Sequence, residues 1–213
     1  MTRLYFIRHG ESESNIDARF TGQLDIPLSE KGREQAKLTA AYLREVPFTA
    51  VYASDLSRAY ETGQIIAEQS GLMAVPTPHL REINGGLWQG ERYAHLEEKF
   101  PTSYGLWRRQ IGLAAAPEGE SVAHLQQRVK AYVEAVVKAH YGEHVCIVTH
   151  ATPIRALECI WTDTPIEDMH MIPWVGNASV TVVDYNEDLK PHIVERNYHQ
   201  HLADLHTELP KTV

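Results

Sequence analysis

The stretch Leu4-Tyr5-Phe6-Ile7-Arg8-His9-Gly10-Glu11-Ser12 decides the fold of this 213-residue chain. Its first four residues form an apolar run of strand length, and its last five are polar or small. A strand that is apolar throughout is buried on both faces, which is typical of a parallel sheet covered by helices. In such sheets ligands bind at the carboxyl ends of the strands. We therefore expect Arg8 and His9 to lie at a binding site.

Three further short apolar runs extend this pattern along the chain. Ala50–Ala53, Val145–Val148 and Val180–Val183 alternate with helical periodicities, which is the signature of βαβ units. The length is below the ~250–300 residues at which single cores usually split. We expect one α/β domain over residues 1–213, a three-layer sandwich with a mostly parallel central sheet and helices on both faces.

Helices are expected between these strands. Ser29 can cap one that runs through about Arg44, the apolar spacing over residues 56–67 predicts a second, and Ser121 can cap a third. Residues from about 76 to 117 are less regular. Long irregular insertions in compact domains are usually lids or binding loops, and we expect such a region here.

Composition excludes several classes of protein. The formal net charge of −8 repels polyanions and argues against a nucleic-acid partner. No run approaches the ~18 apolar residues that span a bilayer, so no membrane partner is expected. The start of the chain lacks the core and cleavage site of a signal peptide, and Cys146 and Cys159 show no disulfide or metal spacing. We expect a cytoplasmic protein with reduced thiols, and a homo-oligomer is compatible with these features.

A second histidine follows another apolar run. His150 comes directly after Val145–Val148 and Thr149, and it would lie near His9 if the two strands are neighbours. A lone histidine at a strand end is more often structural, but two of them beside Arg8 favour a reaction site. Phosphoryl transfer needs an in-line nucleophile and positive charge around three equatorial oxygens. Imidazole, with a reference pKa of ~6.5, and guanidinium supply these functions.

Ordered motifs extend from the first of these histidines to the second. They are Arg8-His9-Gly10-Glu11-Ser12 with Asn15, Phe20-Thr21-Gly22-Gln23-Leu24-Asp25, Leu28-Ser29-Glu30-Lys31-Gly32, Ser54-Asp55-Leu56-Ser57-Arg58-Ala59, Leu80-Arg81-Glu82, Gly86-Leu87-Trp88-Gln89-Gly90, Gly119-Glu120-Ser121 and His150. Together they resemble the histidine phosphatase superfamily, which includes the cofactor-dependent phosphoglycerate mutases. So many blocks in one order are hard to obtain by chance. The resemblance covers most of the chain and implies the phosphoglycerate mutase-like fold.

The resemblance implies that His9 is a nucleophile whose other ring nitrogen is held by the backbone carbonyl of Gly10. Arg8, Arg58 and His150 would bind the phosphoryl oxygens. Arg58 falls in the first turn of its predicted helix, where a positive charge opposes the helix dipole and a bound anion is favoured. The alternative for Arg58 is a surface ion pair with Glu61 or Glu34.

A carboxyl group must protonate the leaving oxygen and later accept a proton from water. The resemblance gives this role to Glu82, which lies in the irregular region. Glu11 is the competing candidate, although hydrogen bonding that supports the His9 loop suits it better. The remaining predicted contacts to substrate are Asn15, Thr21, Gly22 and Gln23.

The predicted activity is hydrolysis of a small phosphorylated metabolite through a phosphohistidine. A phosphoglycerate mutase is the alternative, and Arg108 and Arg109 could then bind a second acidic group. The block Gly86-Leu87-Trp88-Gln89-Gly90 and the length of the chain resemble the phosphatase branch more. A catalytically silent binding module ranks last because all five core residues are present. Sugar phosphates, phosphoglycerate, nucleotide-related esters and the ribazole phosphate of cobalamin synthesis all remain open as substrates.

Other features receive ordinary readings. The family usually has Gly where this chain has Ala151, and Glu where it has Gln89, so these positions bear on substrate identity more than on chemistry. No metal site and no cofactor are expected. Trp161, Trp174 and Tyr132 fit packing in the core or in a lid as well as any role in ligand binding. Histidines near the end of the chain lack the spacing of a metal site and are interpreted as a solvated tail; they are His192, His199, His201 and His206.

Overall fold

The computed structural model describes residues 1–207, without the side chain of Ile16, and one six-stranded sheet forms its centre. The strands are β1 (Thr2–Arg8), β2 (Phe48–Ser54), β3 (Ala74–Thr77), β4 (His144–Thr149), β5 (Val180–Tyr185) and β6 (Pro191–Tyr198). Their order is β3-β2-β4-β1-β5-β6, and β3, β2, β4 and β1 run parallel. β5 is antiparallel to both of its neighbours. The prediction of a mostly parallel sheet is confirmed, and the four apolar runs lie in β1, β2, β4 and β5.

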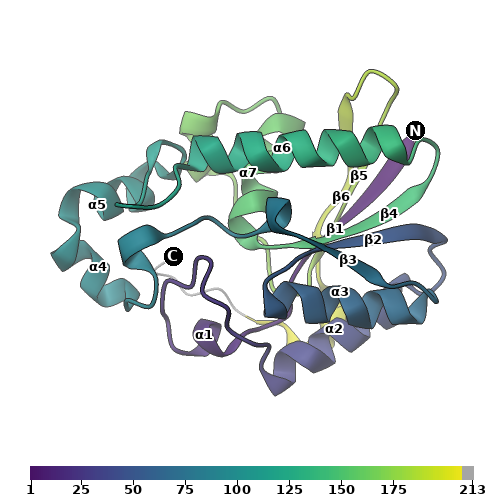
Figure 1. Ribbon diagram of the computed structural model, residues 1–213, viewed down its shortest axis with the longest axis horizontal. Coiled ribbons are helices and arrows are strands. Elements are labelled where there is room, and N and C mark those ends of the chain that lie inside the picture. The colour runs from purple at the N-terminus through teal and green to yellow at the C-terminus, as the bar shows by residue number, and fades with distance from the viewer. Residues whose placement is uncertain (208–213) are drawn as a thin grey trace.

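Helices cover both faces of this sheet (Figure 1). The helices are α1 (Glu13–Ile16), α2 (Glu30–Leu43), α3 (Ser57–Gln69), α4 (Tyr93–Lys99), α5 (Pro101–Arg109), α6 (Val122–Ala139) and α7 (Ala151–Trp161). Leu4 and Phe6 of β1 pack in the core that α6 and α7 complete, whereas Tyr5 and Ile7 pack in the core with α2 and α3. This alternation places one apolar core on each face. The predicted three-layer sandwich is therefore confirmed, and Ser29 and Ser121 cap α2 and α6 as expected.

The irregular region, residues 76–117, extends beyond the sheet as short helices and is called the cap region below (Figure 1). It contains α4 and α5 together with the 3₁₀ helices Pro78–Leu80, Gly86–Trp88 and Ile111–Leu113. Its interior is aromatic: Trp88, Trp107 and Phe20 contact one another edge to face with ring centroids 5.2 to 5.7 Å apart. This cluster is continuous with the core on the α6 and α7 side of the sandwich.

The prediction of a solvated histidine tail is wrong. β6 pairs with β5 along its length, and it contains His192. Beyond it, His201 stacks on Tyr42 of α2 with ring centroids 4.8 Å apart and shares a 2.9 Å hydrogen bond with Thr39. His199 and His206 stack on each other, 4.3 Å apart. These contacts depend on a sheet edge and a helix face that are distant in sequence, so composition alone could not reveal them.

The last described residues pack on α2 directly behind the His9 loop. The amide nitrogen of Gln35 donates to the Leu205 carbonyl at 2.7 Å and to the Thr207 hydroxyl at 2.8 Å. Thr207 in turn donates to a carboxylate oxygen of Glu11 at 3.0 Å. A segment close to the end of the chain therefore supports a residue two positions from His9.

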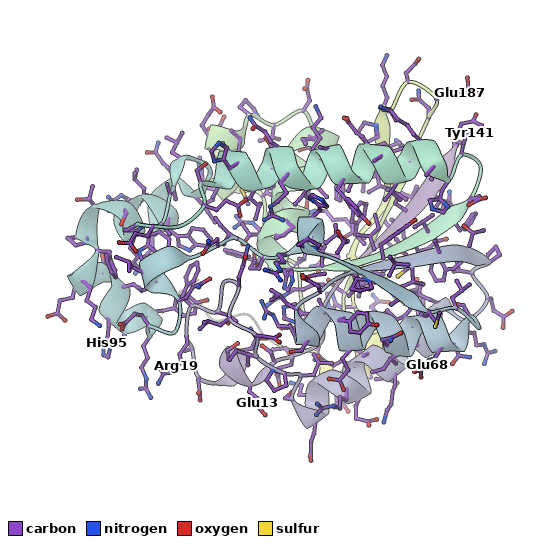
Figure 2. The ribbon with its side chains drawn as sticks, in the orientation of Figure 1. Glu13, Arg19, Glu68, His95, Tyr141 and Glu187 are labelled. Atoms are coloured by element: carbon purple, nitrogen blue, oxygen red, sulfur yellow. The ribbon has the colours of Figure 1, made fainter. Side chains whose placement is uncertain are left out.

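The opposite end of the sheet is closed by contacts between surface loops. There the Tyr141 hydroxyl donates to Glu187 at 2.5 Å, far from the cap region (Figure 2). Among residues 1–207, no helix has the length and apolar character to cross a membrane.

Candidate active site

The two predicted histidines meet at the carboxyl end of the sheet. β1 and β4 are parallel neighbours whose last paired residues are Arg8 and Thr149, so His9 and His150 follow at the same level. Their ring centroids lie 5.0 Å apart. His150 is also the N-cap residue of α7, and its Nε2 is 2.8 Å from the Ser54 hydroxyl. The sheet order thus brings together residues that are 141 positions apart in sequence.

The His9 ring is fixed with one nitrogen available to the cavity. Nδ1 lies 2.6 Å from the backbone carbonyl of Gly10, which can only accept, so Nδ1 carries the proton. Nε2 then has the lone pair, and Arg58 Nε donates to it at 3.3 Å. Burial, with the nearby charges of Arg58 and Arg8, holds the pKa of His9 well below its ordinary value. The ring is therefore neutral at physiological pH, as a nucleophile must be.

Two buried guanidinium groups flank the histidines. Arg58 donates from Nη2 to the Gly22 carbonyl at 2.8 Å and from Nη1 to the Leu24 carbonyl at 2.9 Å. Arg8 donates from Nη1 to the Val175 carbonyl at 2.7 Å, and its Nε has no partner among the described residues. Burial lowers the pKa of each to about 10, so both stay charged at neutral pH. Neither is paired with a carboxylate within residues 1–207, which suits a site for an anionic ligand.

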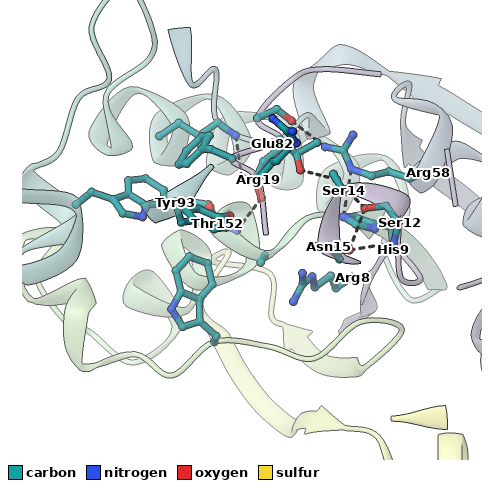
Figure 3. A pocket seen from close by; sticks show the side chains of 17 residues that line it. Arg8, His9, Ser12, Ser14, Asn15, Arg19, Arg58, Glu82, Tyr93 and Thr152 are labelled. Atoms are coloured by element: carbon teal, nitrogen blue, oxygen red, sulfur yellow. Dashed lines mark hydrogen bonds between the residues drawn. The ribbon is translucent and has the colours of Figure 1, made fainter. Parts of the chain in front are cut away.

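The Glu82 carboxylate, from the cap region, lines the same cavity as the guanidinium groups of Arg8 and Arg58 (Figure 3). Its Oε1 accepts from the Ile83 amide at 2.8 Å, and its Oε2 accepts from the Thr152 amide at 3.3 Å. Thr152 lies in the first turn of α7, where the helix dipole favours a negative charge. Glu82 is thus held beside the two arginines without a direct ion pair to either.

The His9 loop rests on the start of α2 through a very close backbone approach. A Cβ atom on Gly10 would lie 2.3 Å from the Gly32 carbonyl oxygen, and one on Gly32 would lie 2.0 Å from the Glu11 carbonyl oxygen. Only glycine fits at both positions. The Glu11 side chain points to the same support, since it accepts from Ser29 at 3.0 Å and pairs with Lys31 at 3.4 Å. The expected supporting role of Glu11 agrees with these contacts.

A cavity joins most of the predicted site residues. Seven of them line it: Arg8, His9, Asn15, Thr21, Gly22, Arg58 and Glu82. His150 is fully buried behind His9 and does not line the cavity. Gln23 does not line it either, because its amide nitrogen donates to the Glu82 carbonyl at 3.0 Å. In this structure Gln23 supports the Glu82 backbone, and its direct contact with substrate stays a prediction.

Ten further residues that line the cavity were not predicted as site residues from the sequence. They are Ser12, Ser14, Arg19, Phe20, Ile83, Tyr93, Trp107, Ala151, Thr152 and Trp174. Trp174, for which packing and ligand binding were both open, lines the cavity and also contacts the guanidinium of Arg155, 3.9 Å from its ring centroid. Arg19 donates to the Gly90 carbonyl at 2.7 Å. The density of aromatic residues in the cap region was a usable signal, but only the fold shows that several of them face His9.

The two arginines that could bind a second acidic group in a mutase lie outside the cavity. Arg108 and Arg109 are exposed at the end of α5 and do not line the cavity, and Arg108 pairs with Glu97 at 3.3 Å. Gln89, which stands where the family usually has Glu, accepts from the Gln23 amide at 2.7 Å and from the Gly85 amide at 3.2 Å. Both contacts need only a side-chain oxygen that accepts hydrogen bonds, and Gln supplies one as Glu would.

The fold and these side chains define the class. The chain belongs to the histidine phosphatase superfamily, branch 1, whose family model matches residues 4–198. It is 33% identical over 213 residues to Phosphoserine phosphatase 1 of Hydrogenobacter thermophilus, covering 100% of both chains. It is 32% identical over 193 residues to the probable phosphoglycerate mutase GpmB of Escherichia coli O1:K1, covering 89% of this chain and 87% of that one.

A solved structure agrees with this classification. YhfR of Bacillus stearothermophilus superposes with a TM-score of 0.90 at 31% identity, covering 95% of this chain and all of that one. The phosphoglycerate mutase-like fold expected from the sequence is thereby confirmed.

Proposed function

We propose that the protein is a phosphomonoester hydrolase that acts on a small phosphorylated metabolite through a phosphohistidine. The observation that carries the proposal is the His9 ring, whose Nδ1 is bound to the Gly10 carbonyl while Nε2 faces Arg58 in the cavity. The relative named Phosphoserine phosphatase 1, which matches over its whole length, supports the same reaction class.

The reaction balances with these side chains alone. His9 Nε2 attacks phosphorus, the ester P–O bond breaks, and protonated Glu82 gives its proton to the leaving oxygen. Arg8 gives up its bond to the Val175 carbonyl, and Arg58 gives up its bonds to the Gly22 and Leu24 carbonyls. Both guanidinium groups then donate to phosphoryl oxygens. Water then gives a proton to Glu82 and attacks phosphorus, the P–N bond breaks, and inorganic phosphate leaves neutral His9. His150, whose ring centroid lies 5.0 Å from that of His9, would have to turn from Ser54 toward the cavity to donate to a phosphoryl oxygen once the site is occupied.

The cap region has a matching role in this proposal. It supplies Glu82, Tyr93 and Trp107 to the lining of the cavity, so it would enclose the leaving group. We assign residues 1–213 to one histidine phosphatase domain in which the cap region acts as the substrate lid.

The competing function is that of a phosphoglycerate mutase, since the two named relatives match at similar identity. A mutase must bind a second acidic group, and Arg108 and Arg109 lie outside the cavity. With 3-phosphoglycerate and a bisphosphoglycerate primer, we expect phosphate release to exceed isomer formation. The measurement is a parallel assay of phosphate and of 2-phosphoglycerate; isomerisation faster than release by orders of magnitude would overturn the hydrolase assignment.

The phosphate-release assay also tests whether the reaction proceeds without a metal ion. Arg8 and Arg58 supply the positive charge that Mg²⁺ provides in other phosphoryl-transfer enzymes. Phosphate release is therefore expected to survive dialysis against a chelator. Loss of activity that Mg²⁺ or Zn²⁺ restores would contradict this part of the proposal.

Replacing Glu82 by Gln is expected to slow hydrolysis of an alkyl phosphate by about 10²–10⁴, the usual contribution of general acid–base catalysis. An amide of the same size cannot release a proton, and an alkoxide is a poor leaving group without one. An activated aryl phosphate, such as 4-nitrophenyl phosphate, should lose much less in the phosphorylation step. Single-turnover rates for ethyl phosphate and 4-nitrophenyl phosphate measure the difference, and equal losses would exclude Glu82 as the acid.

A further inference from the structure

Glu82 lies in a segment with no regular structure. Residues 81–85 belong to neither a helix nor a strand, so their backbone groups must find partners outside a helix or sheet. A general acid nevertheless has to stay within hydrogen-bonding distance of the leaving oxygen. Something else in the molecule must therefore fix the position of this segment.

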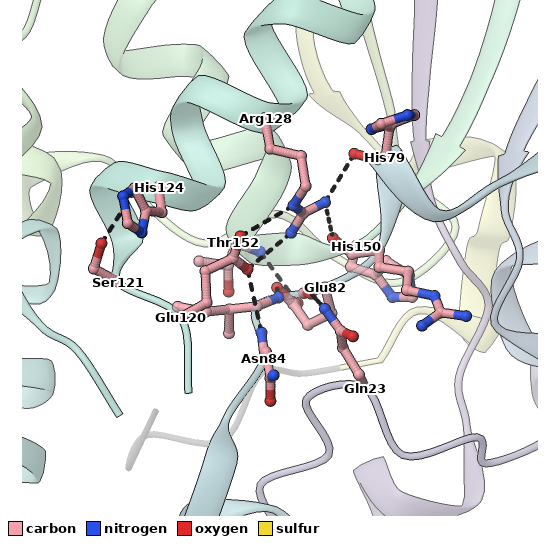
Figure 4. Close-up of polar contacts among 12 residues, drawn as sticks. Gln23, His79, Glu82, Asn84, Glu120, Ser121, His124, Arg128, His150 and Thr152 are labelled. Atoms are coloured by element: carbon pink, nitrogen blue, oxygen red, sulfur yellow. Dashed lines mark hydrogen bonds and ion pairs between the residues drawn. The ribbon is translucent and has the colours of Figure 1, made fainter. Parts of the chain in front are cut away.

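Arg128 of α6 binds the backbone directly before Glu82 and also orients Glu120 (Figure 4). Its Nη1 donates to the His79 carbonyl at 2.8 Å and to the Arg81 carbonyl at 3.1 Å, immediately before Glu82. Its Nε and Nη2 donate to the two carboxylate oxygens of Glu120 at 3.0 and 2.9 Å. Four of the five N–H groups of a guanidinium are used, in the bidentate geometry that only Arg provides.

Glu120 holds the segment on the other side of Glu82. Its Oε2 accepts from the Asn84 amide at 3.3 Å, and its own amide donates to the Asn84 carbonyl at 2.8 Å. A Cβ atom on Gly119 would lie 2.4 Å from that carbonyl oxygen, so glycine is required for this approach. The side chains of Arg128 and Glu120 are 21% and 16% exposed, and the pair is therefore shielded more than an ordinary surface ion pair.

We propose that Arg128 and Glu120 are positioning residues for the general acid, because they fix the backbone on both sides of Glu82 and thereby set the distance from its carboxyl group to the leaving oxygen. The inference rests on the proposed function, since it requires Glu82 to be the proton donor. Neither residue lines the cavity. Their effect on the reaction must therefore pass through Glu82, which gives it a specific kinetic signature.

The test compares leaving groups. Glu120→Gln and Arg128→Lys are expected to lower the single-turnover rate for ethyl phosphate by about 10-fold or more. The loss should not exceed the one expected for Glu82→Gln, which removes the acid itself. The rate for 4-nitrophenyl phosphate should change by less than about 3-fold, because this step needs little protonation. Lys retains the charge but cannot bridge Glu120 and two carbonyls, so Arg128→Lys should not rescue the alkyl rate.

Asp184→Asn is the matched control. Asp184 forms a bidentate pair with Arg3, with both contacts at 2.7 Å, and neither residue lines the cavity. The substitution changes a carboxylate to an amide in the same kind of ion pair as Glu120→Gln does. Thermal unfolding of the variants measures the loss of stability, and the control should leave the ratio of ethyl to nitrophenyl rates unchanged.

Combining Glu120→Gln with Glu82→Gln separates positioning from general weakening of the fold. The double variant is expected to hydrolyse ethyl phosphate at the rate of Glu82→Gln alone, because no acid remains to be misplaced. A further drop in that rate, or equal losses for the two esters in Glu120→Gln, overturns the positioning role while the hydrolase assignment stands. If the unsubstituted protein releases phosphate from neither ester, the proposed function itself fails, and the inference falls with it.

Discussion

Replacement of His9 by Ala is expected to abolish phosphoenzyme formation and to lower turnover by a factor on the order of 10⁶, as in other enzymes that lose a covalent nucleophile. Nε2 of His9 is the unprotonated nitrogen, which accepts a hydrogen bond from Arg58, and burial with the nearby arginine charges keeps the ring neutral. The measurement is a brief exposure to labelled phosphate ester followed by alkaline quenching. The label on the unsubstituted protein should then be lost in acid, as a phosphohistidine is.

His95→Ala is the control for this experiment, because His95 is an exposed histidine of α4 and does not line the cavity (Figure 2). It should retain labelling at the level of the unsubstituted protein. Retained label in His9→Ala would show that another side chain accepts the phosphoryl group, and His150 would be the first residue to examine.

Removal of Arg58 should cost about 10²–10³ in rate, or roughly 3 kcal/mol, the usual loss of one preorganised donor to a developing charge. Arg58→Gln removes the charge of a fully buried guanidinium that contacts the His9 ring at 3.3 Å. His150→Gln should cost a similar factor. The two losses should not multiply in the double variant, since both side chains serve the same phosphoryl group.

The measurements are kcat/KM for a phosphate ester and the inhibition constant of inorganic phosphate. Arg33→Gln is the control, because Arg33 pairs with Glu61 of α3 at 2.6 Å and does not line the cavity. Fully multiplicative losses for Arg58 and His150 would mean that the two residues act at separate places.

Much of the fold was predictable because its central strands are buried on both faces. The runs within β1 and β4 are apolar throughout, so they predict buried strands whatever structure the flanking segments adopt. β3 and β6 were missed for different reasons. β3 has four residues and contains Pro76, which is tolerated at a sheet edge but weakens the signal. β6 alternates half-buried with exposed residues, and its polar side chains, among them His192, hid the strand pattern.

The residues next to His9 could be predicted from the sequence better than the aromatic residues that line the rest of the cavity. His9 and His150 are marked by strands that precede them, and Arg58 and Glu82 stand in motifs that resemble a known family. Tyr93 and Trp174 reach the cavity only through the packing of the cap region and of the loop before β5. Glu120 stands in one of the family-like motifs, but its role and that of Arg128 could not be predicted. The partners of this pair are backbone carbonyls and an amide whose positions depend on the tertiary fold.

The place of β1 in the sheet constrains how the molecule is made. β1 is synthesised before the other five strands of the sheet, yet its two neighbours are β4 and β5, which end at Thr149 and Tyr185. During translation at roughly 5–20 residues per second, β1 therefore waits several seconds with both of its edges unpaired. An apolar strand in that state is a template for aggregation. A nascent chain stalled before residue 144 should need a chaperone to keep the strand that bears His9 from pairing with other chains.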